Sequence, residues 1–211
     1  MSHDGTRPGG GHYFSPVPDV VSDPRAVALD VAGRRLRLAT DRGVFAYGRL
    51  DPGTRVLLDL APPPTGGTLL DVGCGVGPIA LTLATLAPGA TVYAVDVNER
   101  ARDLTAENAA AAGLGNVVVT TPDGVPPELA FDTIWSNPPV RVGADVLRPL
   151  LARWFDRLAP AGEAWLVVQR NLGADALVRW LAGQGYAAVR VRSRKGFGVI
   201  RVPSRKARGS A

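Results

Sequence analysis

One carboxylate and three glycines occur at regular spacing in the stretch "LLDVGCGVGPIAL", which contains Asp71, Gly73, Gly75 and Gly77. Glycines between a strand and a helix allow a tight turn and a close approach of a ligand to the backbone. A further carboxylate, Asp96, ends the next apolar run, about 20 residues after the last glycine. A carboxylate at that place can accept hydrogen bonds from two ribose hydroxyls. The pattern predicts a site for a cofactor that contains a nucleoside.

The order of these residues separates two cofactors. Dinucleotide sites use G-x-G-x-x-G, whereas this stretch reads D-x-G-x-G-x-G and continues with Pro78. The leading Asp71 would repel a pyrophosphate and attract an ammonium group. S-adenosylmethionine carries an ammonium, a sulfonium and a ribose but no phosphate, so the sequence favours it over NAD. A glycine turn that serves strand–helix packing alone is the other interpretation, and we expect Cys74, flanked by glycines, to be structural.

A second chemical feature is the tripeptide Asn137-Pro138-Pro139, which follows the apolar run "FDTIW". An aromatic amine is a poor nucleophile because its lone pair is delocalised into the ring. Two acceptors, the Asn137 side-chain oxygen and the Pro138 carbonyl, would draw the nitrogen toward a tetrahedral shape and aim its lone pair at a methyl donor. Pro138 keeps Asn137 extended, and the prolines have no N–H that could compete for these carbonyls. An ordinary strand end is the alternative.

The elements that position these residues alternate along the chain. Short apolar runs are expected as strands at 68–73, 90–96, 116–121, 131–137 and 162–169, with a closing pair at 187–193 and 197–202. Helical patterns cover 77–88, 98–114, 144–160 and 173–185. This alternation predicts an α/β domain with a seven-stranded, mostly parallel sheet whose last strand is antiparallel. In this topology the strand before Asn137 lies next to the strand that contains Asp71.

The chain organisation follows from composition and breaks. We expect a disordered tail at 1–12, an extension of one β-hairpin and one helix at 13–66, the cofactor-binding domain at 67–203 and a basic tail at 204–211. In the extension, "AGRR" predicts the hairpin turn, and Asp51 and Pro52 predict the start of the helix. The start lacks a signal peptide pattern and no apolar run is long enough to span a bilayer, so we expect a cytoplasmic protein.

Charge and metal ligands give weaker indications. The net charge is +5, which suggests an acidic partner such as RNA, although a bias in genome composition gives the same excess of arginine. The basic residues concentrate near the C-terminus. His3 and His12 have no further ligand at suitable spacing, so no metal site is expected. The single cysteine excludes a disulfide-rich scaffold.

Taken together, "LLDVGCGVG", "VYAVDVN" and "SNPPV" resemble the class I S-adenosylmethionine-dependent methyltransferases of the Asn-Pro-Pro subgroup, which have a Rossmann-like fold. The further stretches "HYFS", "LATDRGVF", "LDPGTRVLL", "VVQR" and "RKGFGVIRV" resemble small bacterial methyltransferases related to the small-subunit ribosomal RNA guanine-N2 methyltransferase. This resemblance extends from about His12 to Val202. It implies S-adenosylmethionine as cofactor and ribosomal RNA, or the small ribosomal subunit, as partner.

The resemblance also implies roles for single residues. The methionine part of the cofactor would be held by Asp71, Gly73, Gly75 and Gly77, and the ribose by Asp96, with Val97 and Asn137 also at the cofactor and Asp123 near the adenine amino group. The target amine would be held by Asn137, Pro138 and Pro139. Substrate contacts would come from Phe45 and Val140. Arg141 and Lys195 are further candidates that could bind phosphate or base, and the alternative is a surface ion pair for Arg141 and a solvated face for Lys195.

Two departures from the family pattern leave other functions open. The larger ribosomal enzyme has two related domains and this chain has one, and Val140 stands where an aromatic residue often stacks on the base. A methyltransferase acting on a protein glutamine amide, which presents the same planar NH2 group, is one alternative. A cofactor-binding RNA or ribosome assembly factor with little turnover is the other.

Overall fold

The computed structural model describes residues 20–205, without the side chains of Arg141 and Leu172. The strands are β1 (Arg25–Val31), β2 (Arg34–Thr40), β3 (Thr68–Val72), β4 (Thr91–Val95), β5 (Val117–Thr120), β6 (Phe131–Ser136), β7 (Leu158–Gln169), β8 (Val189–Arg194) and β9 (Phe197–Pro203). The α-helices are α1 (Pro52–Leu60), α2 (Pro78–Leu86), α3 (Glu99–Ala111), α4 (Ala144–Phe155) and α5 (Ala174–Gly183). Short 3-10 turns are η2 (Pro122–Gly124), η3 (Val140–Val142) and η4 (Arg170–Leu172).

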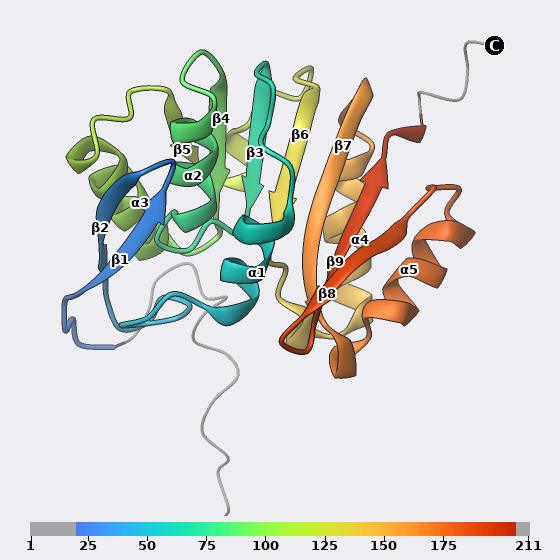
Figure 1. Ribbon diagram of the computed structural model, residues 1–211, viewed down its shortest axis with the longest axis horizontal. Coiled ribbons are helices and arrows are strands. Elements are labelled where there is room, and N and C mark those ends of the chain that lie inside the picture. Colours follow the sequence, from blue (N-terminus) through green and yellow to red (C-terminus); the bar gives the residue numbers. More distant parts are fainter. Residues whose placement is uncertain (1–19, 206–211) are drawn as a thin grey trace, which may run out of the picture.

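The main sheet has seven strands in the order β5-β4-β3-β6-β7-β9-β8 (Figure 1). The pairs from β5 to β7 are parallel, and β9 is antiparallel to both of its neighbours. The predicted sheet with an antiparallel last strand is therefore confirmed, as is the contact between β3 and β6. The carboxyl ends of β3, β4 and β6 meet at one edge, the lower edge in Figure 1. Ligands of open α/β sheets bind beyond this edge.

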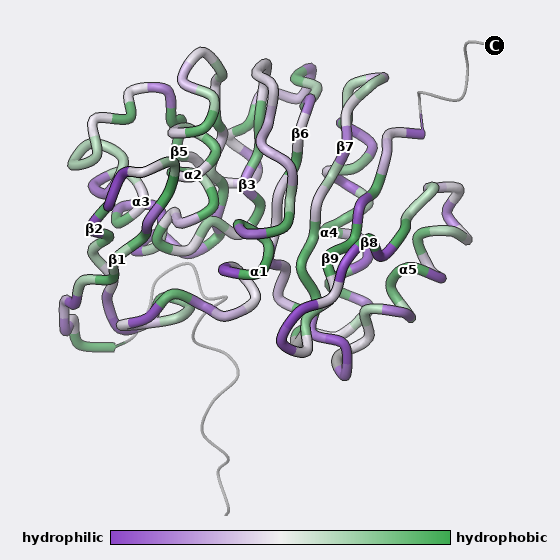
Figure 2. The backbone as a smooth tube through the Cα atoms, viewed as in Figure 1, coloured by the Kyte–Doolittle hydropathy of each residue, from purple (hydrophilic) through white to green (hydrophobic). Residues whose placement is uncertain are grey.

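Helices cover both faces of the sheet. One apolar cluster joins the sheet to α1, α2, α3 and the separate hairpin of β1 and β2. A second cluster joins the opposite face to α4 and α5. Because both faces are covered, the central strands are apolar along most of their length, and the hydropathy colouring of Figure 2 shows this as green segments.

The expected N-terminal elements are present. The turn between β1 and β2 contains Ala32 and Gly33, both with positive φ (49° and 75°), as a two-residue turn of a twisted hairpin requires. Asp51 caps α1, since its carboxylate accepts a hydrogen bond from the N–H of Thr54, and Pro52 is the first helical residue. The expected tail at 1–12 and most of the basic tail at 204–211 lie outside the described residues. The division between 13–66 and 67–203 remains a prediction.

One boundary differs from expectation. The pattern at 144–160 predicts a helix throughout, but α4 ends at Phe155 and β7 already begins at Leu158. Leu158 pairs with Phe131 of β6, so the segment already belongs to the sheet. Pro160 could not continue a helix either, because it has no N–H to donate to a preceding turn. Within residues 20–205, no helix combines the length and apolar character needed to cross a membrane.

Candidate active site

A small cavity lies at the carboxyl edge of the sheet. It brings together four residues that the sequence analysis named as site residues: Phe45, Gly73, Gly75 and Asn137. The other lining residues come from the hairpin, the following loop and the starts of α1 and α2: Val27, Leu38, Ala46, Arg49, Leu50, Asp51, Thr54, Cys74, Val76, Pro78 and Ile79. Segments far apart in the sequence thus meet where a ligand is expected.

The glycine loop between β3 and α2 is held by β4. The N–H groups of Gly73 and Cys74 both donate to the carbonyl of Val95, at 2.9 and 3.0 Å. Gly73 and Gly75 have positive φ (76° and 57°), and a Cβ atom added to either would meet no other atom within 4 Å. The backbone at these glycines is therefore open on the cavity side, as close approach of a cofactor requires.

Gly77 has a different requirement. Its φ is 88°, and an added Cβ would lie 2.8 Å from Leu81 Cδ1 and 3.0 Å from Thr105 Cγ2. Gly77 precedes α2 and does not line the cavity. Here glycine permits the close packing of loop and helices, which is the role that the packing interpretation assigned to the whole motif.

Asp96 follows β4 and holds the glycine loop directly. Its Oδ2 accepts from the N–H of Gly75 at 3.0 Å, and its Oδ1 accepts from the N–H of Asn98 at 2.9 Å. Burial raises the pKa of Asp96 above its ordinary value, against the lowering effect of these two hydrogen bonds. Each carboxylate oxygen keeps a further acceptor position, which fits two ribose hydroxyls. Val97, beside it, is 46% exposed.

Asp71 lies deeper than expected. It is fully buried in β3, does not line the cavity, and its Oδ2 accepts from the N–H of Ala80 in the first turn of α2 at 3.0 Å. Its Oδ1 has no partner among the described residues. Burial, with a further contribution from the charge of Asp96, raises the pKa of Asp71 well above its ordinary value. An unpaired carboxylate oxygen fits a nearby ammonium group, and the contact with the methionine part remains a prediction.

Asn137 is held in one orientation by α1. Its Nδ2 donates to Asp51 Oδ1 at 2.8 Å and to Thr54 Oγ1 at 3.0 Å. A carboxylate can only accept, so the NH2 group of Asn137 must face Asp51. The Oδ1 atom is thereby left without a partner among the described residues, and Asn137 is one of the residues that line the cavity. This is the atom that the sequence analysis assigned to the target amine.

The two prolines have no N–H of their own, as expected, but N–H groups of later residues donate to their carbonyls. The Pro138 carbonyl accepts from the N–H of Val140 at 2.8 Å, and the Pro139 carbonyl accepts from Val142 at 3.1 Å. The competing donors come from two and three residues further along, in η3. A carbonyl oxygen has two lone pairs, so each still has one acceptor position. Val140 packs against the cluster of α4 and α5 rather than lining the cavity. The side chain of Arg141 is outside the described structure.

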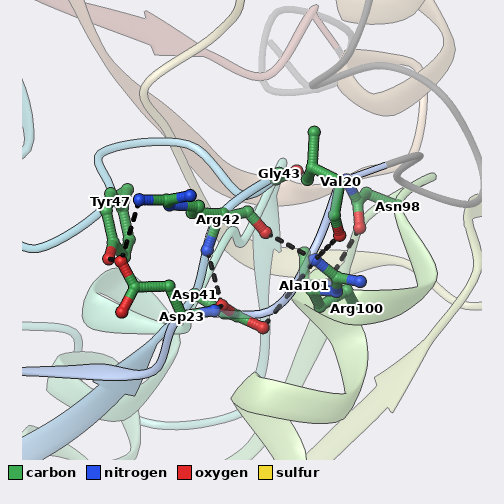
Figure 3. Close-up of polar contacts among 9 residues, drawn as sticks. All are labelled: Val20, Asp23, Asp41, Arg42, Gly43, Tyr47, Asn98, Arg100 and Ala101. Atoms are coloured by element: carbon green, nitrogen blue, oxygen red, sulfur yellow. Dashed lines mark hydrogen bonds and ion pairs between the residues drawn. The ribbon is translucent and has the colours of Figure 1, made fainter.

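The loop that carries Phe45 is tied to the helix after β4 (Figure 3). Asn98 Nδ2 donates to the carbonyl of Gly43 at 2.9 Å, and Arg100 Nη1 donates to the carbonyl of Arg42 at 2.8 Å. The same Asn98 donates its N–H to the carboxylate at the end of β4, so one residue joins the expected ribose site to this loop. Phe45 itself is 49% exposed and lines the cavity.

A buried carboxylate begins this loop. Asp41 Oδ1 accepts from the N–H groups of Asp23 and Arg42, at 2.6 and 2.7 Å, and Arg100 lies 3.7 Å from Oδ2. Burial acts to raise the pKa of Asp41, but the hydrogen bonds and the arginine outweigh it, so the pKa is lowered. A charged, fully partnered Asp41 fixes the start of the loop in Figure 3.

Two further named residues, Asp123 and Lys195, also lie away from the cavity. The side chain of Asp123, in η2, is 89% exposed and forms an ion pair with Arg153 at 2.8 Å. Its contact with adenine remains a prediction and requires this pair to open. Lys195 lies in the turn between β8 and β9, with φ of 51°.

Cys74 is buried, and burial raises the pKa of its thiol well above the ordinary value, so the thiol stays protonated.

No three His, Cys, Asp or Glu side chains between residues 20 and 205 come together as a metal site. His3 and His12 lie outside the described residues, and the absence of a metal remains a prediction. The two residues that hold the amide of Asn137 were not named as site residues by the sequence analysis. Asp51 was expected only as a helix cap, and Thr54 was not singled out.

This geometry agrees with comparisons to known proteins. A family model described as "Methyltransferase small domain" matches residues 35–201. The chain belongs to the methyltransferase small domain family. Within it, the uncharacterized protein YbxB of Bacillus subtilis strain 168 is 36% identical over 174 residues, which cover 81% of this chain and 87% of that relative.

Two further similar proteins have an activity in their names. Ribosomal RNA small subunit methyltransferase C of Pseudomonas aeruginosa strain LESB58 is 35% identical over 167 residues, 76% of this chain and 50% of the relative. The structure of the 16S rRNA N2 G1207 methyltransferase of T. thermophilus, in complex with AdoMet and guanosine, superposes with a TM-score of 0.73 and 25% identity, covering 89% of this chain and 52% of that one. The chain thus spans about half the length of these ribosomal enzymes.

Membership in this methyltransferase family confirms the expected enzyme class, and the structural match confirms the class I, Rossmann-like fold. The residues of this methyltransferase fit S-adenosylmethionine by three observations: open glycines at 73 and 75, a ribose-type carboxylate with free acceptor positions at Asp96, and an unpaired buried oxygen at Asp71.

Proposed function

We propose that this methyltransferase methylates the exocyclic N2 amine of a guanine in ribosomal RNA. S-adenosylmethionine is the methyl donor and supplies an electrophilic methyl group on a sulfonium. The observation that carries the proposal is the fixed orientation of Asn137, a residue of the cavity lining, whose amide nitrogen is engaged by Asp51 and Thr54 and whose oxygen has no partner among the described residues. An acceptor at this place suits a planar NH2 group.

Residues of this chain would act on the amine in two ways. Asn137 Oδ1 accepts a hydrogen bond from one N–H group of the amine. The remaining acceptor position of the Pro138 carbonyl accepts a hydrogen bond from the other N–H group. The nitrogen then becomes more tetrahedral and its lone pair is no longer shared fully with the ring. Rigid placement supplies the rate gain. No strong base is needed, because an alkylated nitrogen releases its proton readily to water.

Recognition of the base would come from the loop over the cavity. The ring of Phe45, half exposed at the cavity, offers a stacking surface, which in single-stranded RNA recognition contributes about 1–3 kcal/mol per base. This would supply what Val140 does not. The net charge of +5 favours an RNA substrate over a protein glutamine amide, although the Asn137 geometry suits both groups.

The substrate class is tested with methyl-tritiated S-adenosylmethionine and three separate substrates: naked ribosomal RNA, assembled small subunits, and ribosomal proteins stripped of RNA. We expect label that nuclease removes and that digestion identifies as N2-methylguanosine. Label in glutamine of a ribosomal protein would replace the proposal with the protein substrate. No label with any substrate, despite measured cofactor binding, would leave the assembly-factor alternative.

A further inference from the structure

The turn between β8 and β9 lies at the same edge of the sheet as the candidate active site. Phe197, just after the turn, pairs with Gln169, the last residue of β7. Because β7 is parallel to β6, the turn extends past the edge at which β6 ends and Asn137 follows. The N–H of Arg170 donates to the carbonyl of Gly196 at 2.9 Å and fixes the turn there.

Helix α1 connects this turn to Asn137. The ring of Phe197 packs on Gly53, so closely that an added Cβ would lie 2.9 Å from Phe197 Cε1. On the same helix, Asp59 pairs with Arg194 at 3.0 Å. Asp51, at the start of α1, holds the amide of Asn137. The turn and the candidate catalytic asparagine are therefore both fixed to one short helix.

A β-bulge directs the arginines of β8. Residues opposite each other in an antiparallel pair share a face of the sheet. Arg190 is opposite Ile200 and pairs with Asp175 of α5 at 3.1 Å. The register shifts after Arg190, so Arg192 lies opposite Val199, which belongs to the cluster on the α1 face.

Arg194, opposite Phe197, lies on the α1 face as well. All residues of β8 are exposed, so this end of the face has no cover in the described structure. We use the name basic tip for the four residues Arg170, Arg192, Arg194 and Lys195, all exposed. Arg194 is partly neutralised by Asp59, whereas no ion pair forms at the other three within residues 20–205. Figure 2 shows the tip as a hydrophilic stretch at the lower edge.

Charged residues on an edge strand also prevent association with other sheets. Prevention of such association explains the charges along β8. It does not explain the charge at the turn or the charge on Arg170, which follows β7. The gathering of cations at the edge that holds the active site indicates an anionic partner at that place. Arginine forks match phosphate oxygens in particular.

We propose that the basic tip binds backbone phosphates of the RNA strand that flanks the target nucleotide. The proposal rests on the RNA substrate proposed above. In this arrangement the strand crosses the turn of β8 and β9 and the start of α1 before its base enters the cavity.

The test compares two double variants with the same change in charge. Arg192→Glu/Lys195→Glu changes the tip, and Arg37→Glu/Arg179→Glu changes two exposed arginines on the β1–β2 hairpin and on α5, away from the tip. RNA affinity is measured by filter binding at several salt concentrations, and cofactor affinity by calorimetry. Removal of one phosphate-binding cation lowers the slope of log affinity against log salt by roughly 0.7 to 0.9.

We expect the tip variant to bind RNA at least about 10-fold more weakly and to show a lower salt slope, with cofactor affinity unchanged. The control should bind RNA within about 2-fold of the parent. If the charge reversal disturbs folding, the neutral double variant Arg192→Gln/Lys195→Gln is used in its place. This variant should also weaken RNA binding and lower the salt slope. Parent-like RNA affinity and slope in both tip variants, or an equal loss in the control, would overturn the proposal. A parent protein that labels only protein would overturn the RNA substrate and the tip together.

Discussion

The amide of Asn137 donates a 2.8 Å hydrogen bond to the carboxylate of Asp51, a residue 86 positions earlier in the chain. The same oxygen of Asp51 accepts the N–H of Thr54 at 2.9 Å and so caps α1. One atom therefore begins a helix and orients the asparagine proposed to hold the target amine. The position of α1 and the chemistry of the site are linked through it.

Asp51→Ser should separate these two functions. Serine is a good helix cap, so we expect the free energy of unfolding to stay within about 0.5 kcal/mol of the parent. Its side chain is too short to reach the Asn137 amide, so the methyl-transfer rate at saturating substrates should fall roughly 10- to 100-fold through loss of orientation. Single-turnover kinetics and thermal unfolding are measured together. An unchanged rate would mean that Asp51 is only a cap.

Gly75→Ala should mainly lower cofactor affinity, whereas Gly77→Ala should mainly lower the stability of the fold. The methyl group at position 75 enters open space at the cavity wall, so cofactor affinity should fall at least about 10-fold, while positive φ costs only about 1–2 kcal/mol. At position 77 the methyl group meets Leu81 and Thr105, and the free energy of unfolding should fall by about 1–3 kcal/mol more. Chemical unfolding and cofactor titration distinguish the two. Equal stability losses would argue against the open glycine.

Cofactor binding should depend on the charge of Asp96. The ionised carboxylate is the better acceptor for ribose hydroxyls, and burial raises the pKa of Asp96. As pH falls, affinity should therefore begin to decrease above the range of an ordinary aspartate. Asp96→Asn should bind the cofactor more weakly at neutral pH and lose this dependence. Calorimetric titration across the acidic range measures both. Parallel pH profiles for parent and variant would remove Asp96 from the ribose contact.

Asp71 should make the protein without cofactor less stable as pH rises. Its folded pKa lies well above the unfolded value near 3.8, so the folded state binds more protons between these two values. Stability is then present at lower pH and decreases as pH rises through that interval. Asp71→Asn removes this pH-dependent contribution to the free energy of unfolding. The stability of the variant relative to the parent should therefore increase with pH. Urea unfolding at several pH values provides the comparison; a difference that stays constant with pH would contradict the buried, raised pKa.

Much of the fold follows from local sequence. The apolar runs, the glycine turn and the helix start at Asp51 are set by residues close in the chain, and the structure has them. The bulge in β8 and the orientation of Asn137 depend on packing between distant segments. Asn108 illustrates the same limit, although it lies within a helix rich in polar residues. Its buried side-chain amide forms hydrogen bonds with the backbone of Ala39 and Val76, and so joins the hairpin to the glycine loop. No pattern within α3 marks it.

The prolines after Asn137 show a limit of another kind. Fixed φ and missing N–H groups are correctly read from proline, but the acceptor capacity of a carbonyl also depends on the residues that follow. The donor that reaches the Pro138 carbonyl is the N–H of Val140, and the turn that brings it there belongs to η3. Loops after strands are shaped by such short-range bonds, which the residue types alone do not determine.

The most direct test of the central claim is the single-turnover rate of methyl transfer to ribosomal RNA in Asn137→Ala, with cofactor affinity measured on the same preparation. We expect a loss of about 100-fold or more in rate, because a preorganised acceptor is removed, with cofactor affinity nearly intact. A variant that methylates RNA as fast as the parent would contradict the assignment of Asn137 Oδ1 to the target amine.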